Sequence, residues 1–328
     1  MKTAIYGYGN LGRGVEAALS KCPDMELFGI FSRRDPSQVK TLTNAPVYKS
    51  EDIIKYKNDI DVVIICGGSA TDLPVMTPML AKDFNVVDSF DTHARIPEHF
   101  GNVDASAKES SHTALISGGW DPGLFSLARA LSDSILPNAK SYTFWGRGVS
   151  QGHSDAVRRI SGVKDARQYT VPVEAALEAV RSGSEPELTT RQKHTRECFV
   201  VVEPECDTPL EKARIEKEIV TMPNYFDEYD TSVFFITEEE MKANHSSLPH
   251  GGSVISTGKT GLDNENNETV EFKLRLDSNP QFTSSVLVAL ARAVYKKYTA
   301  KQYGCFTIFN VSPAELSAKT PDELRKLL

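Results

Sequence analysis

The chain has 328 residues, of which 40% are hydrophobic and 25% charged, as in an ordinary globular protein long enough for two domains. Its net charge of -7 argues against a nucleic-acid-binding protein, which normally presents a basic face. We find no secretory signal and no apolar run of the roughly 20 residues that span a bilayer, so we expect a cytoplasmic protein without a membrane partner. The five cysteines include no C-x-x-C pair, which disfavours a disulfide framework and favours reduced thiols.

Three glycines follow the first expected strand and open a helix. Ala4 to Tyr6 end a short buried strand, and Gly7, Gly9 and Gly12 have the G-x-G-x-x-G spacing. In a dinucleotide site, the first glycine permits the tight turn and the second lets a pyrophosphate approach the backbone. The third lets the helix lie close against the strand. The spacing therefore predicts a dinucleotide site, and the alternative is a turn that needs glycine for steric reasons alone.

The second expected strand, residues 25–31, ends in Ser32-Arg33-Arg34. In an NAD site, an acidic residue at about this place accepts a hydrogen bond from the ribose 2′-hydroxyl. A hydroxyl and two guanidiniums suit a 2′-phosphate instead, so we predict NADP as the cofactor. The alternative is a solvated basic turn that Asp35 partly neutralises.

A third strand is expected over residues 61–66, an unbroken apolar run with the β-branched residues of a central parallel strand. A loop of small residues follows at 67–71, on the edge where doubly wound folds bind their ligands. Asp72 is then expected to cap the next helix, with Pro74 in its first turn.

Two further strands are each followed by a carboxylate. Residues 84–90 lead to Asp91, and residues 112–117 lead to Asp121. Because both strands end on the edge that carries the cofactor, we interpret the two carboxylates as functional. The alternative is that each aspartate caps a helix, which is common before a residue such as Pro122.

The second half of the chain is richer in strands than in helices. After a helix expected over residues 122–136, the expected strands are residues 141–145, 197–202, 231–236, 252–257 and 269–276. The expected helices are residues 173–181, 210–220 and 282–298, and residues 263–268 form a turn. The sequence thus predicts an α/β protein. A Rossmann-type, doubly wound dinucleotide-binding domain spans 1–121, and an α+β substrate and dimerisation domain with a mostly antiparallel sheet spans 122–281. Residues 282–328 are expected to pack back on the first domain.

The histidines do not have the spacing of a metal site. His93 and His99 are six apart, and His245 and His250 are five apart, which does not match a zinc motif. We therefore expect no metal.

Seven short motifs spread over most of the chain resemble one enzyme family. They are Gly7-Tyr-Gly-Asn-Leu-Gly-Arg13, Phe31-Ser-Arg-Arg34, Gly68-Ser-Ala-Thr-Asp72, Gly119-Trp-Asp-Pro-Gly123, Ser150-Gln-Gly-His-Ser-Asp155, Leu248-Pro-His-Gly-Gly252 and Leu276-Asp-Ser-Asn-Pro280. In these motifs the chain resembles the meso-diaminopimelate D-dehydrogenase family. The resemblance implies a homodimeric NADP enzyme of lysine and peptidoglycan-precursor metabolism. Such an enzyme reversibly deaminates the D-centre of meso-2,6-diaminopimelate to L-2-amino-6-oxopimelate and ammonia. Two departures, a longer stretch at 206–211 and Arg95 in place of an acid, touch no implied site residue.

The resemblance also implies which residues form the site. The cofactor residues are Gly7, Tyr8, Gly9, Asn10, Leu11, Gly12, Ser32, Arg33, Arg34, Cys66, Gly67, Gly68, Ser69, Ala70 and Thr71. The residues implied around the D-centre are Asp91, Trp120, Asp121, Gln151, Gly152 and Asp155, and Trp145 is a further substrate-binding residue. The residues implied around the unreactive L-centre are Thr170, Arg196, His250 and Asn279.

The chemistry of the substrate agrees with these residue types. Asp91 and Asp121 suit an ammonium, which must lose a proton before hydride can leave the neighbouring carbon. Which of the two is the base stays open. Arg196 suits the distant carboxylate as a two-pronged donor. The alternative for Arg196 is membership of a solvated basic run with Arg191 and Lys193.

Two alternative functions remain at this point. The first is another NADP-dependent amino-acid dehydrogenase or a dihydrodipicolinate-type reductase. The second is a non-catalytic NADP-binding sensor, which would not need the paired carboxylates Asp91 and Asp121.

Overall fold

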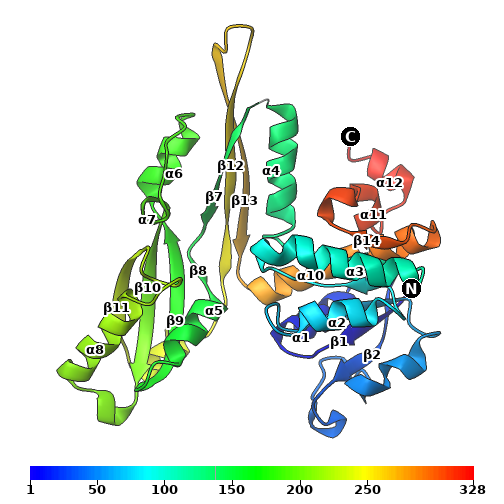
Figure 1. Cartoon of the computed structure of the whole chain (residues 1–328), viewed down its shortest axis with the longest axis horizontal. Coiled ribbons are helices and arrows are strands. Elements are labelled where there is room, and N and C mark those ends of the chain that lie inside the picture. The colour runs from blue at the N-terminus through cyan, green and yellow to red at the C-terminus, as the bar shows by residue number, and fades with distance from the viewer. Residues whose placement is uncertain (137) are drawn as a thin grey trace. The chain divides into compact units, whose positions relative to one another are not determined.

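The computed structural model describes residues 1–136 and 138–328, which form two compact units (Figure 1). Unit 1 comprises Met1–Leu127 and Pro280–Leu328, and unit 2 comprises Ala128–Asn279. The sequence placed the boundaries after residues 121 and 281. The first boundary lies a few residues later because Leu127, in the first turn of helix α4 (Leu124–Ile135), packs against the core of unit 1.

Within the described residues, unit 1 is built on a seven-stranded parallel sheet. Its strands are β1 (Lys2–Tyr6), β2 (Glu26–Ser32), β3 (Val47–Lys49), β4 (Val62–Ile65), β5 (Val86–Val87), β6 (Thr113–Leu115) and β14 (Gly304–Phe306). The order β14-β6-β5-β4-β1-β2-β3 reverses between β1 and β4, the Rossmann arrangement in which ligands bind at the carboxyl edge near the reversal. The predicted fold class is confirmed.

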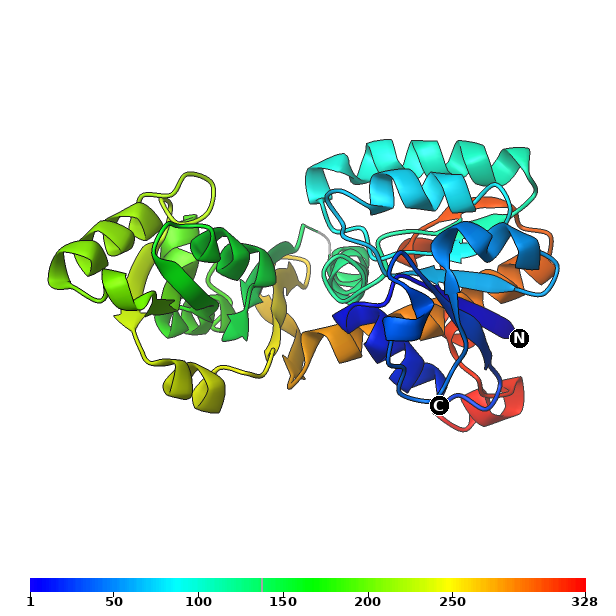
Figure 2. The same ribbon diagram turned by 90° about the horizontal axis from the view of Figure 1, so that it is seen from below.

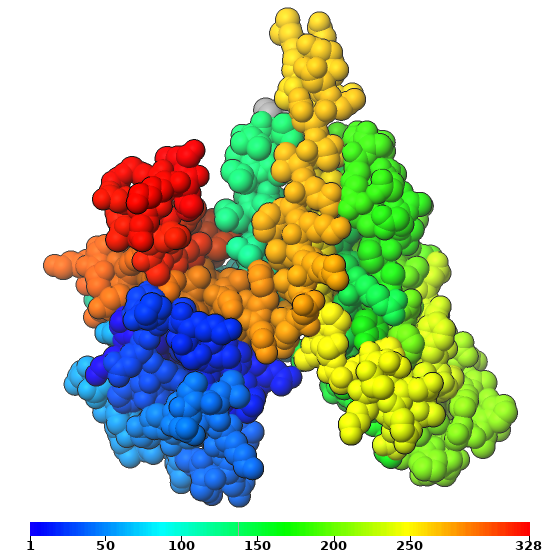
Figure 3. Space-filling model, turned by 180° about the vertical axis from the view of Figure 1, so that it is seen from behind, coloured from blue at the N-terminus to red at the C-terminus, as the bar shows by residue number. Residues whose placement is uncertain are grey.

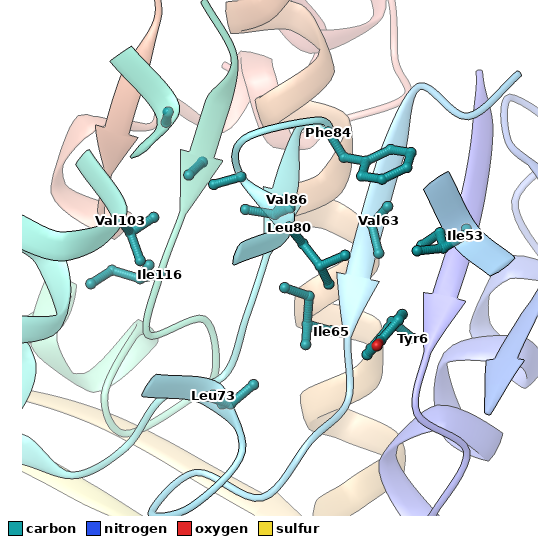
Figure 4. Close-up of a cluster of buried hydrophobic side chains, with 14 of the residues drawn as sticks. Tyr6, Ile53, Val63, Ile65, Leu73, Leu80, Phe84, Val86, Val103 and Ile116 are labelled. Atoms are coloured by element: carbon teal, nitrogen blue, oxygen red, sulfur yellow. The ribbon is translucent and has the colours of Figure 1, made fainter. Parts of the chain in front are cut away.

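Helices cover both faces of this sheet, which is why its central strands β4 and β5 are wholly apolar and buried (Figure 2). They are α1 (Asn10–Leu19), α2 (Leu73–Leu80), α3 (Ile96–Glu109) and α10 (Asn279–Thr299), with the short α11 (Pro313–Leu316) and α12 (Pro321–Arg325) near the C-terminus. Val63 and Ile65 of β4 pack with α2 and α3 on one face (Figure 4). Val62 and Ile64 of the same strand pack on the other face, in the core that holds α1 and α10. Through α10 the chain returns to unit 1.

Two local expectations in unit 1 were wrong. The strand expected over 84–90 is confined to Val86–Val87. After Asp88 the chain leaves the sheet, because the Phe90 backbone N–H donates to the Asp88 carboxylate and not to a neighbouring strand. Asp72 precedes α2, but its carboxylate does not cap that helix. It accepts hydrogen bonds from the Gly68 amide at 2.9 Å and from Arg33 instead.

Unit 2 contains two sheets within the described residues, where the sequence suggested one. One sheet has the order β11 (Asp230–Phe235), β10 (His194–Val202), β9 (Val163–Pro172), β8 (Gly148–Val149). The other has the order β13 (Asn266–Leu276), β12 (His250–Thr260), β7 (Lys140–Trp145). All pairs are antiparallel except β10 with β11. The mostly antiparallel character is therefore confirmed.

The two sheets have separate cores, each closed by its own helices. The helices of unit 2, besides the later turns of α4, are α5 (Gln151–Arg158), α6 (Glu174–Arg181), α7 (Thr190–Lys193), α8 (Pro209–Val220) and α9 (Glu238–Asn244). Ile215 and Ile219 of α8 pack on the first sheet, and Leu177 and Val180 of α6 pack on the second. The hairpin of β12 and β13 extends beyond the rest of unit 2 (Figure 3).

Candidate active site

The glycine loop lies at the carboxyl edge of the unit 1 sheet, and two of its glycines are required by close contacts. Gly7 has φ of +97°, and a Cβ there would lie 2.8 Å from the Cys66 carbonyl oxygen. A Cβ on Gly12 would lie 2.3 Å from the Gly7 carbonyl oxygen, so only glycine lets α1 approach the loop this closely. A Cβ on Gly9 would meet no protein atom within 4 Å. Contacts within the protein therefore do not require glycine at position 9, and the backbone there is open to a ligand.

A cleft of about 330 Å³ opens beside this loop. Its lining residues are Tyr6, Gly7, Tyr8, Gly9, Phe31, Ser32, Arg33, Arg34, Ser50, Cys66, Gly67 and Met76. Most of the predicted cofactor residues are among them. Of the others, Asn10, Leu11 and Gly12 form the first turn of α1, and Gly68, Ser69, Ala70 and Thr71 form the loop that leads to α2.

The two arginines after β2 are held in different ways. Arg34 donates to the Tyr8 carbonyl oxygen, and its own amide donates to Ser32 Oγ at 3.1 Å. Arg33 donates from both terminal nitrogens to the Asp72 carboxylate at 3.2 Å, and its side chain stays 68% exposed. Asp35 bonds Ser37, so Asp72 and not Asp35 is the acid that pairs with this turn. The backbone N–H of Gly68, followed by the Arg33 guanidinium, lowers the pKa of Asp72 although partial burial opposes this shift.

A buried carboxylate on α1 fixes Tyr8 of the glycine loop. Glu16 accepts hydrogen bonds from the Tyr8 hydroxyl, from the amides of Leu42 and Thr43, and from the Thr43 hydroxyl at 2.6 Å. Burial raises the pKa of Tyr8 to about 12, helped by its hydrogen bond to Glu16. Burial alone would raise the pKa of Glu16, but these hydrogen bonds outweigh it and hold the pKa below its usual value. No sequence pattern indicated this role for Glu16, because a glutamate on a helix is usually solvent-exposed.

The two candidate catalytic carboxylates follow adjacent parallel strands. Asp91 comes after β5 and is exposed, with its amide donating to Ser69 Oγ at 2.8 Å. Asp121 comes after β6 and is partly exposed, beside the buried Trp120. Neither is the residue immediately before a helix, since Thr92 precedes the next helical turn and α4 begins at Leu124. Thr92, and not Asp91, is therefore the cap residue of the helical turn that follows β5.

In unit 2, Thr170 and Arg196 are brought together by the register of β9 and β10. They lie directly opposite each other, and Arg196 donates to the Thr170 hydroxyl. Arg196 is only 4% exposed, so it is not part of a solvated basic run with Arg191. Its guanidinium carbon lies 3.9 Å from the centre of the Tyr229 ring, a contact that the sequence did not predict.

Arg196 is a buried cation without a matching acid. Among the residues that the structure describes, no carboxylate lies within ion-pair distance of it, and its Nε has no hydrogen-bond partner. Burial lowers the pKa of this guanidinium, while Tyr229 opposes the shift. A buried charge normally has a partner because desolvating it alone is costly. The arrangement suits an anionic ligand group.

Two other predicted residues of unit 2, His250 of β12 and Trp145 of β7, lie on the second sheet and contact strands of the first. A Cβ on Gly148, the β8 residue opposite Thr170, would lie 2.7 Å from the His250 ring, so His250 sits next to this row of side chains. Trp145 stacks on His194 with ring centres 5.2 Å apart, and its amide donates to His194 Nε2. Burial lowers the pKa of His250 and lowers that of His194 to about 3, so His194 is neutral at pH 7.

The remaining predicted residues occupy helix ends. Gln151 and Gly152 form the exposed first turn of α5, which Ser150 precedes. Asp155 of α5 pairs at 3.0 Å with Arg159, the residue that follows this helix, and is half-exposed. Asn279 begins α10, and its amide donates to the Leu248 carbonyl oxygen at 2.9 Å.

His153 of α5 is not among the predicted site residues but lies close to Arg196. Its Nδ1 lies 2.7 Å from Ser150 Oγ, and its ring packs edge-on against Tyr225 and Phe226. Burial, and then the charge of Arg196, lower its pKa to about 4.

The described residues contain no group of three or more histidine, cysteine or acidic side chains placed to hold a metal ion. Nor does any helix in the described part have the length and apolar character to cross a membrane.

Comparison with known proteins agrees along the whole chain. Residues 119–278 match the model of the diaminopimelic acid dehydrogenase C-terminal domain. The meso-diaminopimelate D-dehydrogenase of Ureibacillus thermosphaericus is 56% identical over 328 residues, covering 100% of this chain and 99% of that protein. The Corynebacterium glutamicum DAP dehydrogenase in complex with DAP has a TM-score of 0.90 at 45% identity, covering 99% of this chain and 98% of its own. An engineered D-amino acid dehydrogenase bound to NADP+ has a TM-score of 0.85 at 43% identity, with coverage of 99% and 98%. The chain therefore belongs to the meso-diaminopimelate D-dehydrogenase family.

Proposed function

We propose that the protein catalyses the NADP-dependent, reversible oxidative deamination of the D-centre of meso-2,6-diaminopimelate. The products are L-2-amino-6-oxopimelate, ammonia and NADPH, a reaction of lysine and peptidoglycan-precursor biosynthesis. The observation that carries this function is the 56% identity to a meso-diaminopimelate D-dehydrogenase over the full length of both chains. The geometry of each unit agrees with it.

The residues of unit 1 fit NADP. The open backbone at Gly9, the N-terminus of α1 and the cleft beside them suit a pyrophosphate. Arg33 and Arg34 line the same cleft and offer two guanidiniums to a 2′-phosphate. When bound, NADP supplies the acceptor for the hydride that leaves the D-centre carbon.

Unit 2 offers the features needed to hold the unreactive end of the substrate. We propose that Arg196 binds the carboxylate of the L-centre, with Thr170 fixing the guanidinium and Tyr229 covering its face. His250 and Asn279 are proposed to bind polar groups of the same end. Holding a remote group in this way aligns the reacting carbon and contributes to turnover.

The proton chemistry is assigned to the carboxylates of unit 1. The substrate enters as an ammonium, and one carboxylate, Asp91 or Asp121, takes a proton so that the nitrogen lone pair can form the imine as hydride leaves. The other carboxylate stabilises the positive charge of the imine. Water then adds to the imine carbon, its protons pass to the nitrogen, and the nitrogen leaves as ammonium when the C=O bond forms. The carboxylate releases the proton it took to solvent, which accounts for the one proton that the oxidation produces.

The test is an absorbance assay at the NADPH band with purified protein, meso-diaminopimelate and NADP. We expect NADPH to form with meso-diaminopimelate, and we expect the reverse reaction to require ammonia. NADPH oxidation without ammonia would support a reductase of the dihydrodipicolinate type. NADP binding without turnover on any amino acid would support a sensor.

A homodimer and a cytoplasmic location are further proposals, which rest on the resemblance to the family.

A further inference from the structure

We infer that Asp88 is a positioning residue for the deamination reaction, because its buried carboxylate ties together the two chain segments that carry Asp91 and Asp121. This inference rests on the proposed function. Asp88 follows β5 and is fully buried in unit 1, and none of the motifs that indicated the site includes it.

The Asp88 carboxylate accepts hydrogen bonds at both oxygens. Oδ1 accepts from the backbone N–H of Phe90 at 3.0 Å and of Ser117 at 2.9 Å. Oδ2 accepts from the Thr77 hydroxyl at 2.7 Å and lies 2.7 Å from His99 Nε2, which donates to it. These bonds fill the acceptor sites of an ionised carboxylate, which explains how the charge is tolerated away from water.

The two backbone bonds lead to the two candidate catalytic segments. Phe90 immediately precedes Asp91, whose own amide is held by Ser69 Oγ at 2.8 Å. Ser117 begins the segment that runs to Asp121, and the next amide, that of Gly118, donates to the Asp88 carbonyl oxygen at 2.8 Å. One residue therefore holds both segments, with its side chain and with its backbone.

The second segment needs such a restraint. Ser117 has φ of +57°, a left-handed conformation that a side chain makes unfavourable. At Gly118 a Cβ would lie 2.6 Å from Leu290 and 3.0 Å from the Asp88 carbonyl oxygen, so the chain passes closely between Asp88 and α10. Beyond it, the Trp120 carbonyl accepts from the Phe125 amide at 2.7 Å, which fixes the far side of Asp121.

His99 supports the carboxylate from the outer side. It lies on α3, is 3% exposed, and stacks on Phe90 with ring centres 4.2 Å apart. Its Nδ1 has no hydrogen-bond partner among the described residues, so the ring is oriented by Asp88 and Phe90. Asp88 thus holds the Phe90 backbone by a hydrogen bond, and His99 holds the Phe90 ring by stacking. Both contacts restrict the position of the next residue, Asp91.

The test compares Asp88→Ala and Asp88→Asn with the wild type in the meso-diaminopimelate assay. Asp88→Ala removes both backbone bonds, and we expect kcat to fall tenfold or more while the Kd for NADPH changes less than twofold. We expect the deuterium isotope effect on kcat, measured with substrate deuterated at the D-centre, to rise as hydride transfer becomes slower. Asp88→Asn keeps an oxygen for Phe90 and Ser117, and its amide can donate to His99 in the other tautomer. It should therefore recover most of the activity.

Asn85→Ala is the matched control, because it removes a buried clamp from the opposite end of the same strand. Asn85 donates to the Asp61 carbonyl oxygen at 2.8 Å and accepts from the Thr113 amide at 2.9 Å. We expect Asn85→Ala to lower Tm. It should change neither kcat, expressed per mole of protein that binds NADPH, nor the isotope effect.

If Asp88→Ala keeps kcat per bound NADPH within twofold of wild type, Asp88 only stabilises the fold and the inference is wrong. If Asp88→Ala does not fold, the kcat of Thr77→Val tests the inference instead. This substitution removes one donor at nearly constant volume, and we expect at least a threefold lower kcat, whereas an unchanged kcat would overturn the inference. A wild-type protein without activity on meso-diaminopimelate would instead refute the proposed function.

Discussion

At the scale of single residues, Arg196 is the side chain whose surroundings most need an explanation. It is buried, it has no acid to balance it among the described residues, and it is braced by Thr170 and Tyr229. Arg196→Met keeps the apolar stem and removes every donor. If the guanidinium binds the remote carboxylate, kcat/KM for meso-diaminopimelate should fall by a factor equivalent to roughly 2–5 kcal/mol. D-alanine and D-norleucine have no second carboxylate, so their kcat/KM should be unchanged or higher.

The control for this prediction is Arg191→Met. Arg191 pairs with Asp230 at the surface, with a half-exposed side chain, and should be replaceable without effect. An equal loss on all substrates in Arg196→Met would mean that Arg196 supports the fold or the D-centre.

A second residue-scale prediction concerns the choice of NADP over NAD. Replacing Arg33 and Arg34 together by Ala removes the two guanidiniums that would bind a 2′-phosphate, a group that NAD lacks. Hydrogen bonds to charged groups contribute roughly 1.5–3 kcal/mol each, so NADP should bind at least tenfold more weakly while NAD changes little. Fluorescence titration of NADPH and NADH measures both affinities. Arg325→Ala, an exposed arginine of the C-terminal helix α12, controls for net charge. Equal weakening of both cofactors would mean that the turn is structural.

Candidate site residues were proposed from the sequence where their type and their place at a strand end agree, as for Gly7, Arg33 and Asp121, and their roles stay predictions. Their partners could not be predicted in this way. Asp72 pairs with Arg33, which lies 39 residues earlier in the sequence. Tyr229, the residue before β11, covers the guanidinium of Arg196 in β10. Such contacts depend on the packing of elements, which a local pattern does not contain.

At the scale of elements, helix α1 does more than present its N-terminus to the cleft. Through Glu16 it also binds Tyr8 and the backbone at 42–43, so one buried carboxylate joins the glycine loop to the segment after β2. The pKa of Glu16 is lower in the folded chain than its ordinary value of 4.5. Its contribution to stability is therefore complete above pH 4.5 and is lost as the pH falls through the lower, folded value.

Glu16→Gln should accordingly lower the free energy of unfolding at pH 7 by about 1–3 kcal/mol, because a buried acceptor is lost. The difference between the mutant and the wild type should shrink as the pH falls below 4.5. Urea unfolding at a series of pH values measures it. Glu98→Gln, which affects only a surface pair with Arg95, should change stability by less than about 1 kcal/mol. A pH-independent difference for Glu16→Gln would show that shape and not charge is responsible.

Hydrophobic periodicity predicted whether several segments form helices or strands. It did not predict which strands pair with one another in a sheet. The apolar run of β4 predicted a central strand, and the structure confirms it. The short β8 and the long β9 were missed, although β9 carries Thr170. The polar residues of β9 alternate with buried ones, and its buried face itself includes Gln168 and Thr170, so the apolar signal is weak. The division of unit 2 into two sheets also depends on pairings between distant segments.

At the scale of the whole molecule, the proposed homodimer needs a surface that a second copy covers. Within unit 2, β13 is an edge strand of 11 residues that pairs only with β12 in the described sheet. Val270 and Phe272 on this strand are 36% and 38% exposed. Long edge strands with exposed apolar side chains pair readily with other chains, so we expect β13 to lie in the dimer interface.

Phe272→Glu places a charge on that surface and should convert the protein to a monomer, because an unpaired carboxylate would be desolvated at the interface. Analytical ultracentrifugation over a range of protein concentrations measures the change, and the wild type should sediment as a dimer. The matched control is Phe234→Glu on β11, the edge strand of the other sheet, where Phe234 is 44% exposed. It should leave the dimer intact. Dissociation by Phe234→Glu alone would assign the interface to the other sheet. A monomeric wild type would remove the homodimer proposal while leaving the assignment of the reaction to each chain unaffected.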